Sequence, residues 1–504
     1  MTSVLADDNR TRPVRAAITI AVAVLAVGGG ISASYVSPVL FAAFGVVLAA
    51  VVAYASLHWP RAVLVVVAMS PILDRYIALG ILDLRVEALS HFLSEGLLLA
   101  VGVCLVAQAA RRGTLRAAFW HPTTAFLLVF LAVAVASAVA NGVTPVQAIA
   151  GIGFTLDAVA FFFLARLADF NLRQAVIAVG AFIAFMALAA AIVLAQALLT
   201  PHLLGLYALQ GNFGEVYRLA AFFSDPNVFA AFVSAVVPFV LFGVPGLRTR
   251  RTRAWALSLA SLLVLALWLS FSRGGWLGAV VGFGIASAIL DRRALVVGIV
   301  VAVITFVVAW VMPRDLLTGS GHAPDLFRST IGRAGAVGTG RDLRILFVIN
   351  GIPIVRDHPA LGVGPGRYGG AAADRFGTDV YAEYGTDRLF TNPMQRTVDN
   401  FWLHLLGETG AVALLAFVGM VGAPLIQVMR SARTAAWARR VMLSGIAGAV
   451  LALCVNSLTT MLLEANSVAF LFWFLLGLGS TLAVPPSPRE ENLAAGTGAG
   501  AGAE

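Results

Sequence analysis

Arginine recurs beside hydroxyl and carboxylate side chains in the second half of the chain. One such segment is 217–227, which contains Arg218, and another is 270–276, which contains Arg273. All 34 basic residues are arginine, so every cation is a permanent, forked donor suited to phosphate or carboxylate. These two segments therefore predict contacts with an anionic group.

A third segment begins in a long polar stretch and ends where an apolar run begins. It holds two arginines, a histidine before a proline, and an Asp-Asn pair: Arg341, Arg344, His358, Asp399 and Asn400. A carboxylate or imidazole within about 3 Å of a hydroxyl can act as its general base, so Asp399 is a candidate contact for the hydroxyl of a substrate. The alternative is that Asp399 only caps the helix that follows.

Structural roles are favoured for several neighbouring residues. His358 precedes a proline and is expected to hold a turn, and Asn400 is expected to support the local structure. His404 lies five residues after Asp399, off the same helical face, and is expected in the core or at the membrane interface. The glycines of 362–366 lack the strand-then-helix context of a dinucleotide fingerprint, so a compact turn is the favoured interpretation.

The elements that position these residues are predicted to be membrane-spanning helices. Apolar residues make up 60% of the 504-residue chain and charged residues only 12%, with a mean hydropathy of +0.92. Soluble domains contain about 25% charged residues because a water-facing surface needs them. A chain this poor in charge must hide most of its surface in lipid. Its net charge of +9 therefore describes loops and does not indicate a nucleic-acid partner.

The hydropathy pattern predicts an all-α polytopic membrane protein of about fourteen spans, since a helix needs about 20 apolar residues to cross the hydrocarbon. Spans one to eleven form an N-terminal bundle over 1–312, a large loop covers 313–398, and three spans lie in 399–484. The Pro- and Gly-rich segment 485–504 is expected to be a disordered tail. The spans are 16–33, 36–57, 62–80, 92–110, 123–140, 146–166, 174–199, 226–247, 254–271, 275–290, 294–312, 400–429, 441–462 and 466–484.

The distribution of arginine predicts the orientation. Both termini and the gaps after even-numbered spans hold 20 arginines, whereas the opposite short gaps hold four. The positive-inside rule therefore places both termini in the cytoplasm and the large loop outside. A cleaved signal peptide in place of the first span is disfavoured because it would leave an odd number of spans.

The motifs, in their order and sidedness, resemble the O-antigen ligase and Wzy-type polymerase superfamily. Its members look like ten to fourteen spans with one large outer loop near the C-terminal third, and they transfer lipid-carried glycans outside the cytoplasmic membrane. The chain has the family's arginine before a Pro-Asn turn, its Ser-Arg-Gly turn, its His-Pro followed by spaced glycines, and the asparagine that opens the next span: Arg218, 272–274, 358–366 and Asn400. The resemblance covers residues 210–425.

The resemblance implies a donor, an acceptor and roles for the candidate residues. The donor would be an oligosaccharide linked to undecaprenyl diphosphate, and the acceptor a hydroxyl of a glycan or of a lipid core. Arginine can stabilise the departing diphosphate without a metal or another cofactor. A chain-length regulator and a flippase would be partners. The implied catalytic residues are Asp399, Arg218 and Arg341, and the implied substrate-binding residues are Arg273, Arg344, Asn400 and His358.

One position departs from the family pattern. The usual histidine of the family's His-Asn pair, which is proposed to activate the acceptor in ligases, is Asp399 here. This change favours a polymerase over a ligase that joins glycan to a lipid core. A transporter or flippase is the competing class, but transporters gather ionisable groups at mid-membrane. Here Asp157 is the clearest intramembrane acid, and a hydrogen-bonded packing contact is its favoured role.

Overall fold

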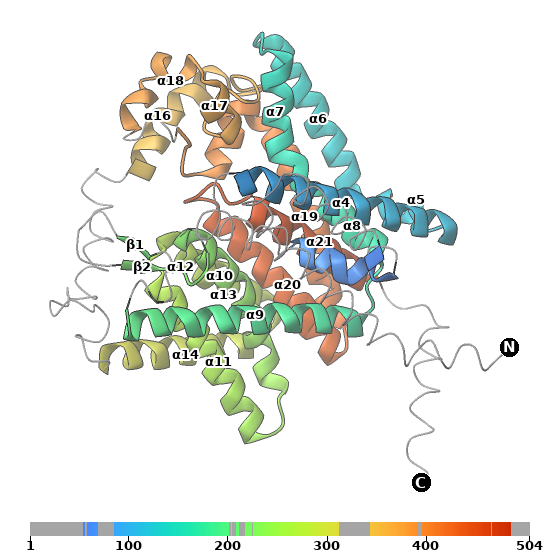
Figure 1. Cartoon of the computed structure of the whole chain (residues 1–504), viewed down its shortest axis with the longest axis vertical. Coiled ribbons are helices and arrows are strands. Elements are labelled where there is room, and N and C mark those ends of the chain that lie inside the picture. Colours follow the sequence, from blue (N-terminus) through green and yellow to red (C-terminus); the bar gives the residue numbers. More distant parts are fainter. Residues whose placement is uncertain are drawn as a thin grey trace. The chain divides into compact units, whose positions relative to one another are not determined.

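The structure is a computed structural model (Figure 1). The described residues are 54–55, 58–68, 85–200, 203, 208–210, 217–223, 225–311, 343–390, 396–464 and 466–484. The predicted first span, Arg341 and the tail 485–504 lie outside them. The chain divides into two compact units, 1–117 and 118–504, and each is considered by itself.

Unit 1 is helical where it is described. A helix covers residues 60–68, and α4 (Arg85–Arg112) contains the predicted span 92–110. Helix α4 ends where Gly113 takes a left-handed conformation with a φ of 69°, which glycine adopts without steric cost. The short α5 (Leu115–Phe119) leads into unit 2.

Unit 2 is a bundle of helices with one small two-stranded sheet. Its described elements are α6 (Pro122–Ala140), α7 (Pro145–Leu156), η1 (Asp157–Val159), α8 (Ala160–Ala168), α9 (Leu172–Leu198), β1 (Ala208–Gln210), β2 (Tyr217–Leu219), α10 (Pro226–Gly243), η3 (Val244–Gly246), α11 (Arg250–Leu269), α12 (Arg273–Leu277), η4 (Gly278–Gly282), α13 (Phe283–Leu290), α14 (Arg292–Val311), α16 (Leu343–Asp357), α17 (Ala371–Phe376), α18 (Val380–Glu383), η7 (Thr386–Leu389), α19 (Phe401–Thr434), α20 (Trp437–Asn456) and α21 (Asn466–Ala483).

Within the described residues, eight helical segments are long and apolar enough to cross a membrane. They are Pro122–Ala140, Pro145–Ala168, Leu172–Leu198, Pro226–Gly246, Arg250–Leu269, Arg273–Leu290, Phe401–Thr434 and Trp437–Asn456. The helices α14 and α21 also lie on predicted spans, the eleventh and the fourteenth. The protein is therefore an all-α multi-pass membrane protein, and the total of fourteen spans stays a prediction.

Local sequence signals explain where these helices begin. Three of them have proline in the first turn, where its missing N–H is not needed. Asp225 caps α10 by accepting from Asn227 N at 2.6 Å. Asn171 and Gln174 form a reciprocal capping box at the start of α9. The predicted span 146–166 contains one interruption, because Asp157 lies in η1 between α7 and α8 and its Oδ1 accepts from the backbone N of Ala158.

Contacts between distant connections define two ends of unit 2. At the first, which we name the arginine-rich end, Arg440 donates to Leu290 O at 2.6 Å and Arg439 to Leu482 O at 2.7 Å. At the second, which we name the loop end, Asn141 donates to Gly362 O at 3.1 Å. The contacts at each end therefore join only connections that the predicted alternation of spans places on the same side of the membrane. Which end faces the cytoplasm stays a prediction.

Helix α10 lies in the centre of unit 2 and packs along α20 (Figure 1). Of its apolar window, 83% is buried inside the protein, against 28% for α6, whose remaining surface suits lipid. Glycines allow α20 to approach α10 closely. A Cβ on Gly445 would overlap the Phe239 ring, and one on Gly448 would lie 2.7 Å from Pro238 Cβ. The helix that follows Arg218 is thus firmly anchored in the bundle.

Helix α19 is interrupted at Gly410, which has a φ of 77° and a ψ of 179°. The interruption exposes backbone groups that need partners, because lipid supplies none. The segment before Tyr368 supplies them: Val363 N and Gly364 N donate to the carbonyls of Gly407 and Glu408 at 2.9 and 2.8 Å. Ala411 N donates to Pro359 O at 2.9 Å on the other side. The glycine-rich segment is therefore built into the helix that follows it.

Candidate functional site

Arg218 lies on β2, which pairs with β1 in an antiparallel hairpin at the loop end. Its Nη2 donates to Asn227 Oδ1 at 2.7 Å, and its Nε donates to Ser270 O at 3.2 Å. Ser272 Oγ donates to the same Asn227 oxygen at 2.9 Å. The structure therefore joins the first two motif segments through one asparagine, which we name the Asn227 junction.

Arg273 begins α12, immediately after the Asn227 junction. Ser272 caps this helix by accepting from Gly275 N at 3.3 Å. Phe271 has a positive φ of 49°, which a bulky residue adopts only where the surroundings hold it there. This sharp turn brings Arg273 next to Ser272 and, through the junction, near Arg218. Two cations predicted to bind the same anionic group are thus placed on neighbouring elements.

Arg344 and Asp399 form an ion pair at the loop end. Arg344 Nε lies 3.5 Å from Asp399 Oδ2, and their side chains are 24% and 46% exposed. Arg344 comes from the first turn of α16 and Asp399 from the residue before the cap of α19. Because the carboxylate stays accessible to water, it can also meet a hydroxyl of an incoming molecule. The ion pair joins two residues for which the sequence analysis predicted separate roles, substrate binding for Arg344 and catalysis for Asp399.

The cap of α19 is Asn400, not Asp399. Asn400 Oδ1 accepts from Leu403 N at 3.0 Å, and the residue has extended backbone angles. The alternative in which Asp399 serves only as the cap is therefore wrong, while the structural role expected for Asn400 is confirmed. A role for Asn400 in binding substrate stays a prediction.

His358 follows the last residue of α16 and begins a tight turn. Its N donates to Ile354 O at 2.9 Å, and its carbonyl accepts from Gly362 N at 3.0 Å. The glycines at 362, 364 and 366 all have positive φ, between 65° and 109°. This confirms the compact turn predicted for 362–366. The contact proposed between His358 and substrate stays a prediction.

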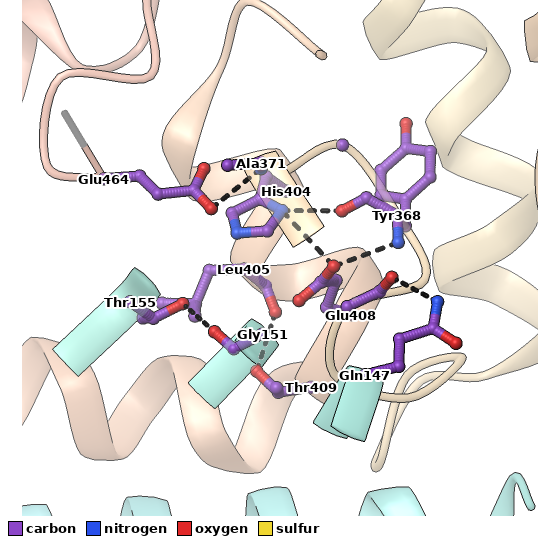
Figure 2. A network of polar contacts seen from close by, with 12 residues as sticks. Gln147, Gly151, Thr155, Tyr368, Ala371, His404, Leu405, Glu408, Thr409 and Glu464 are labelled. Carbon is purple, nitrogen blue, oxygen red and sulfur yellow. Dashed lines mark hydrogen bonds and ion pairs between the residues drawn. The ribbon is translucent and has the colours of Figure 1, made fainter. Parts of the chain in front are cut away.

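A buried cluster of ionisable groups lies behind this turn (Figure 2). His404 and Glu408 are 1% and 2% exposed, so His404 lies in the core, one of the two positions expected for it. Glu408 Oε1 accepts from Tyr368 N at 3.0 Å, and His404 Nδ1 lies 2.6 Å from Tyr368 O. Glu464, beyond the end of α20, accepts from Ala371 N at 2.9 Å. Three side chains from membrane helices and their ends thus hold the backbone of one loop segment.

Two tyrosines complete the packing of this segment. Burial raises the pKa of the Tyr368 and Tyr381 phenols well above their ordinary range, so both stay protonated. Tyr381 Oη donates to Arg396 O at 2.8 Å and accepts from Gly369 N at 2.9 Å. Arg396 lies three residues before Asp399. The cluster therefore fixes the chain on both sides of the Arg344–Asp399 pair.

The described residues contain no group of three or more His, Cys, Asp or Glu side chains arranged to hold a metal ion. The geometry instead offers cationic and hydrogen-bonding groups at one end of a membrane bundle. Such an arrangement can bind an anionic leaving group and orient a hydroxyl.

The O-antigen ligase family model matches residues 258–418, about a third of the chain. This stretch runs from α11 into α19 and includes Arg273, Arg344 and Asp399. This stretch of the chain is therefore similar to the O-antigen ligase family. The match supports the O-antigen ligase and Wzy-type superfamily that the motifs indicated. No curated relative matches the chain.

The matched stretch also contains two buried ionisable residues, His404 and Glu408, that the sequence analysis did not connect. His404 was compared only with Asp399, although Glu408 lies four residues further along the same helical face. A His and a Glu at this spacing in an apolar helix are an identifiable signal, because ionisable groups inside a membrane are costly. Arg218 lies outside the matched stretch, and the Asn227 junction connects it to that stretch.

Proposed function

We propose that the protein transfers undecaprenyl-diphosphate-linked glycan units to an acceptor hydroxyl on the outer face of the cytoplasmic membrane. The proposed product is a polymerised surface or secreted polysaccharide. Two observations support the proposal: the Asn227 junction, which links Arg218 to the turn before Arg273, and the Arg344–Asp399 ion pair. The family match supports glycan transfer of the ligase or polymerase type.

The leaving group is the diphosphate, and its negative charge grows as the sugar departs. Guanidinium groups stabilise such charge through paired hydrogen bonds. In the proposed reaction Arg218 and Arg273 bind the diphosphate from the two sides of the Asn227 junction. Arg341 is proposed as a third contact.

The acceptor hydroxyl must lose a proton as it attacks. We assign Asp399 as the group that accepts it or that orients the hydroxyl. Arg344 holds the carboxylate in place at 3.5 Å. Aspartate where the family usually has histidine favours the polymerase over the ligase.

Transfer to a lipid core is the second candidate, because the matched family is described as O-antigen ligase. A lipid-linked-glycan flippase is less well supported. The charged and polar candidates described above lie at the loop end, and a transporter is expected to concentrate them at mid-membrane.

A deletion strain tests these alternatives through the length ladder of its surface polysaccharide. Loss of long chains with single repeats still present supports the polymerase. Long chains that are no longer joined to a lipid core support the ligase. Donor that accumulates on the cytoplasmic face supports the flippase, and an unchanged ladder contradicts all three.

A further inference from the structure

The end of α20 lies between the two halves of the proposed site. Phe401 N, two residues after Asp399, donates to Ser457 O at 3.0 Å. On the other side, a Cβ built on Gly274 would lie 2.6 Å from Asn456 Oδ1. Two consecutive residues at the end of α20 therefore contact the Asp399 turn and the Arg273 turn.

The side chain of Asn456 is buried, with an exposed fraction of 0%. Neither its Oδ1 nor its Nδ2 has a hydrogen-bond partner among the described residues. Buried polar atoms in proteins are nearly always paired, because an unpaired atom loses its bonds to water without replacement. Several other buried side chains in this part of the chain have one unpaired atom, but Asn456 has two. Its carboxamide is a donor and an acceptor that the described protein leaves unused.

We propose that Asn456 is a substrate-binding residue for the transferred sugar, the one bonded to the donor's diphosphate. This inference rests on the proposed function. A sugar hydroxyl both donates and accepts, so it can satisfy both ends of a carboxamide, whereas a diphosphate oxygen only accepts. The neighbouring arginines suit the diphosphate. The chemistry of the amide therefore matches the sugar better than the leaving group.

The position of Asn456 fits the geometry of the transfer. The bond between the anomeric carbon and the diphosphate oxygen breaks, and its electron pair leaves with the diphosphate. The acceptor oxygen forms the new bond to the anomeric carbon, and its proton passes to Asp399. The sugar must therefore lie between the diphosphate and the acceptor. Asn456 lies between Arg273, assigned to the first, and Asp399, assigned to the second.

The Gly274 turn covers the amide in the structure. The sugar therefore reaches Asn456 when this turn shifts away from α20. Glycine at 274 is what lets this turn lie so close to the amide. A methyl group there would overlap Thr459 Oγ1 as well as approach Asn456.

Asn456→Leu tests the inference because it removes the unpaired atoms while filling the same space. We expect the thermal unfolding temperature of the purified protein to stay equal or rise, since no hydrogen bond within the described residues is lost. We expect the long-chain polysaccharide signal to fall about tenfold or more, since both bonds to the sugar are lost. A structural asparagine would instead lower both quantities together. Asn456→Ala repeats the test with a smaller side chain.

Ser444→Ala is the matched control on the same helix. Its Oγ is also buried and unpaired among the described residues, but it lies three turns from Asn456. We expect its unfolding temperature to stay equal or rise and its polysaccharide ladder to match the wild type. A loss of transfer in this control would mean that removing any unpaired polar atom from α20 impairs transfer, which would overturn the inference.

A binding measurement separates the sugar from the diphosphate. Undecaprenyl diphosphate carries the leaving group without the sugar, and we expect it to raise the unfolding temperature of wild type and Asn456→Leu equally. Loss of this shift in the variant would place the contact on the diphosphate and overturn the inference. A polysaccharide ladder like that of the wild type in Asn456→Leu would also overturn the inference. The deletion strain tests the proposed function separately. An unchanged ladder in the deletion strain would instead reject the proposed function itself.

Discussion

Asparagine at position 399 removes the carboxylate and leaves the surrounding structure intact. The ion pair of Asp399 with Arg344 is 3.5 Å long, and the Asp399 side chain is 46% exposed. Pairs this accessible to water contribute about 0.2–1 kcal/mol to stability. The cap of α19 is supplied by Asn400 and survives the change. We therefore expect Asp399→Asn to lower the free energy of unfolding by less than about 1 kcal/mol.

The expected effect on glycan transfer is much larger. A general base contributes about 10²–10⁴-fold to a rate, which corresponds to about 2.7–5.5 kcal/mol of activation free energy. Asparagine has the same shape as aspartate but does not accept the proton. We therefore expect Asp399→Asn to abolish long-chain polysaccharide. Asp399→His restores the family's usual pair and should keep partial activity, because an imidazole also accepts a proton near neutral pH.

The assay is the polysaccharide length ladder from cells that carry each variant at matched protein level, together with the unfolding temperature of the purified protein. Asn171→Ala is the control for stability alone. It removes the capping box of α9, at a cost of about 0.5–2 kcal/mol. We expect it to lower the unfolding temperature while the folded protein keeps its ladder.

Full transfer by Asp399→Asn would refute the reasoning. The carboxylate would then have a structural role, to which its ion pair with Arg344 contributes, and another group would have to receive the proton. If Asp399→Asn lost transfer and also lowered the free energy of unfolding by much more than about 1 kcal/mol, the small stability contribution argued for the exposed ion pair would be wrong.

Four further predictions concern other parts of the protein. Arg218→Lys keeps one charge but replaces a fork by a single nitrogen, so transfer should fall about tenfold or more at normal membrane abundance; a wild-type ladder would reduce Arg218 to an interfacial anchor. Glu408→Leu removes a buried acceptor of backbone N–H groups and should lower the free energy of unfolding by about 1–3 kcal/mol, so an unchanged unfolding temperature would contradict the role drawn for it. Burial lowers the pKa of His121, which caps α6, so the unfolded state binds the proton first as pH falls. The stabilisation is then complete above about pH 6.5 and lost below it, and His121→Asn should reduce the drop in unfolding temperature between pH 7 and pH 5; an identical drop would rule this out. A reporter fused at Gly335 should read as extracytoplasmic and one at Ala435 as cytoplasmic, whereas the reverse readings would invert the orientation.

The sequence predicted best what local signals determine. The predicted spans 123–140, 174–199 and 226–247 begin within two residues of α6, α9 and α10, since caps and prolines act within one turn. The alternative in which Asp399 caps α19 was wrong by one residue. Asp and Asn cap about equally well, and only the extended backbone at Asn400 decides between them.

Contacts between distant segments were harder to predict. The link from Arg218 through Asn227 to Ser272 spans more than 40 residues, and the Arg344–Asp399 pair spans more than 50. Each depends on how helices pack, which periodicity along the chain does not specify. The hold of Glu408 on Tyr368 was missed for the same reason, since its partner is a backbone N–H that any residue would offer.

The interruption of α19 also bears on how this protein can be recombined with its relatives. Residues 359–364 complete the hydrogen bonding of 407–411, so neither segment is satisfied without the other. These bonds join backbone groups, so a chimaera that exchanges only the loop or only the helix keeps them only if the new segment adopts the same turn, which needs glycine at 362, 364 and 410. Exchange of 358–411 as one block keeps these bonds together, and the boundaries of functional chimaeras should fall outside this range.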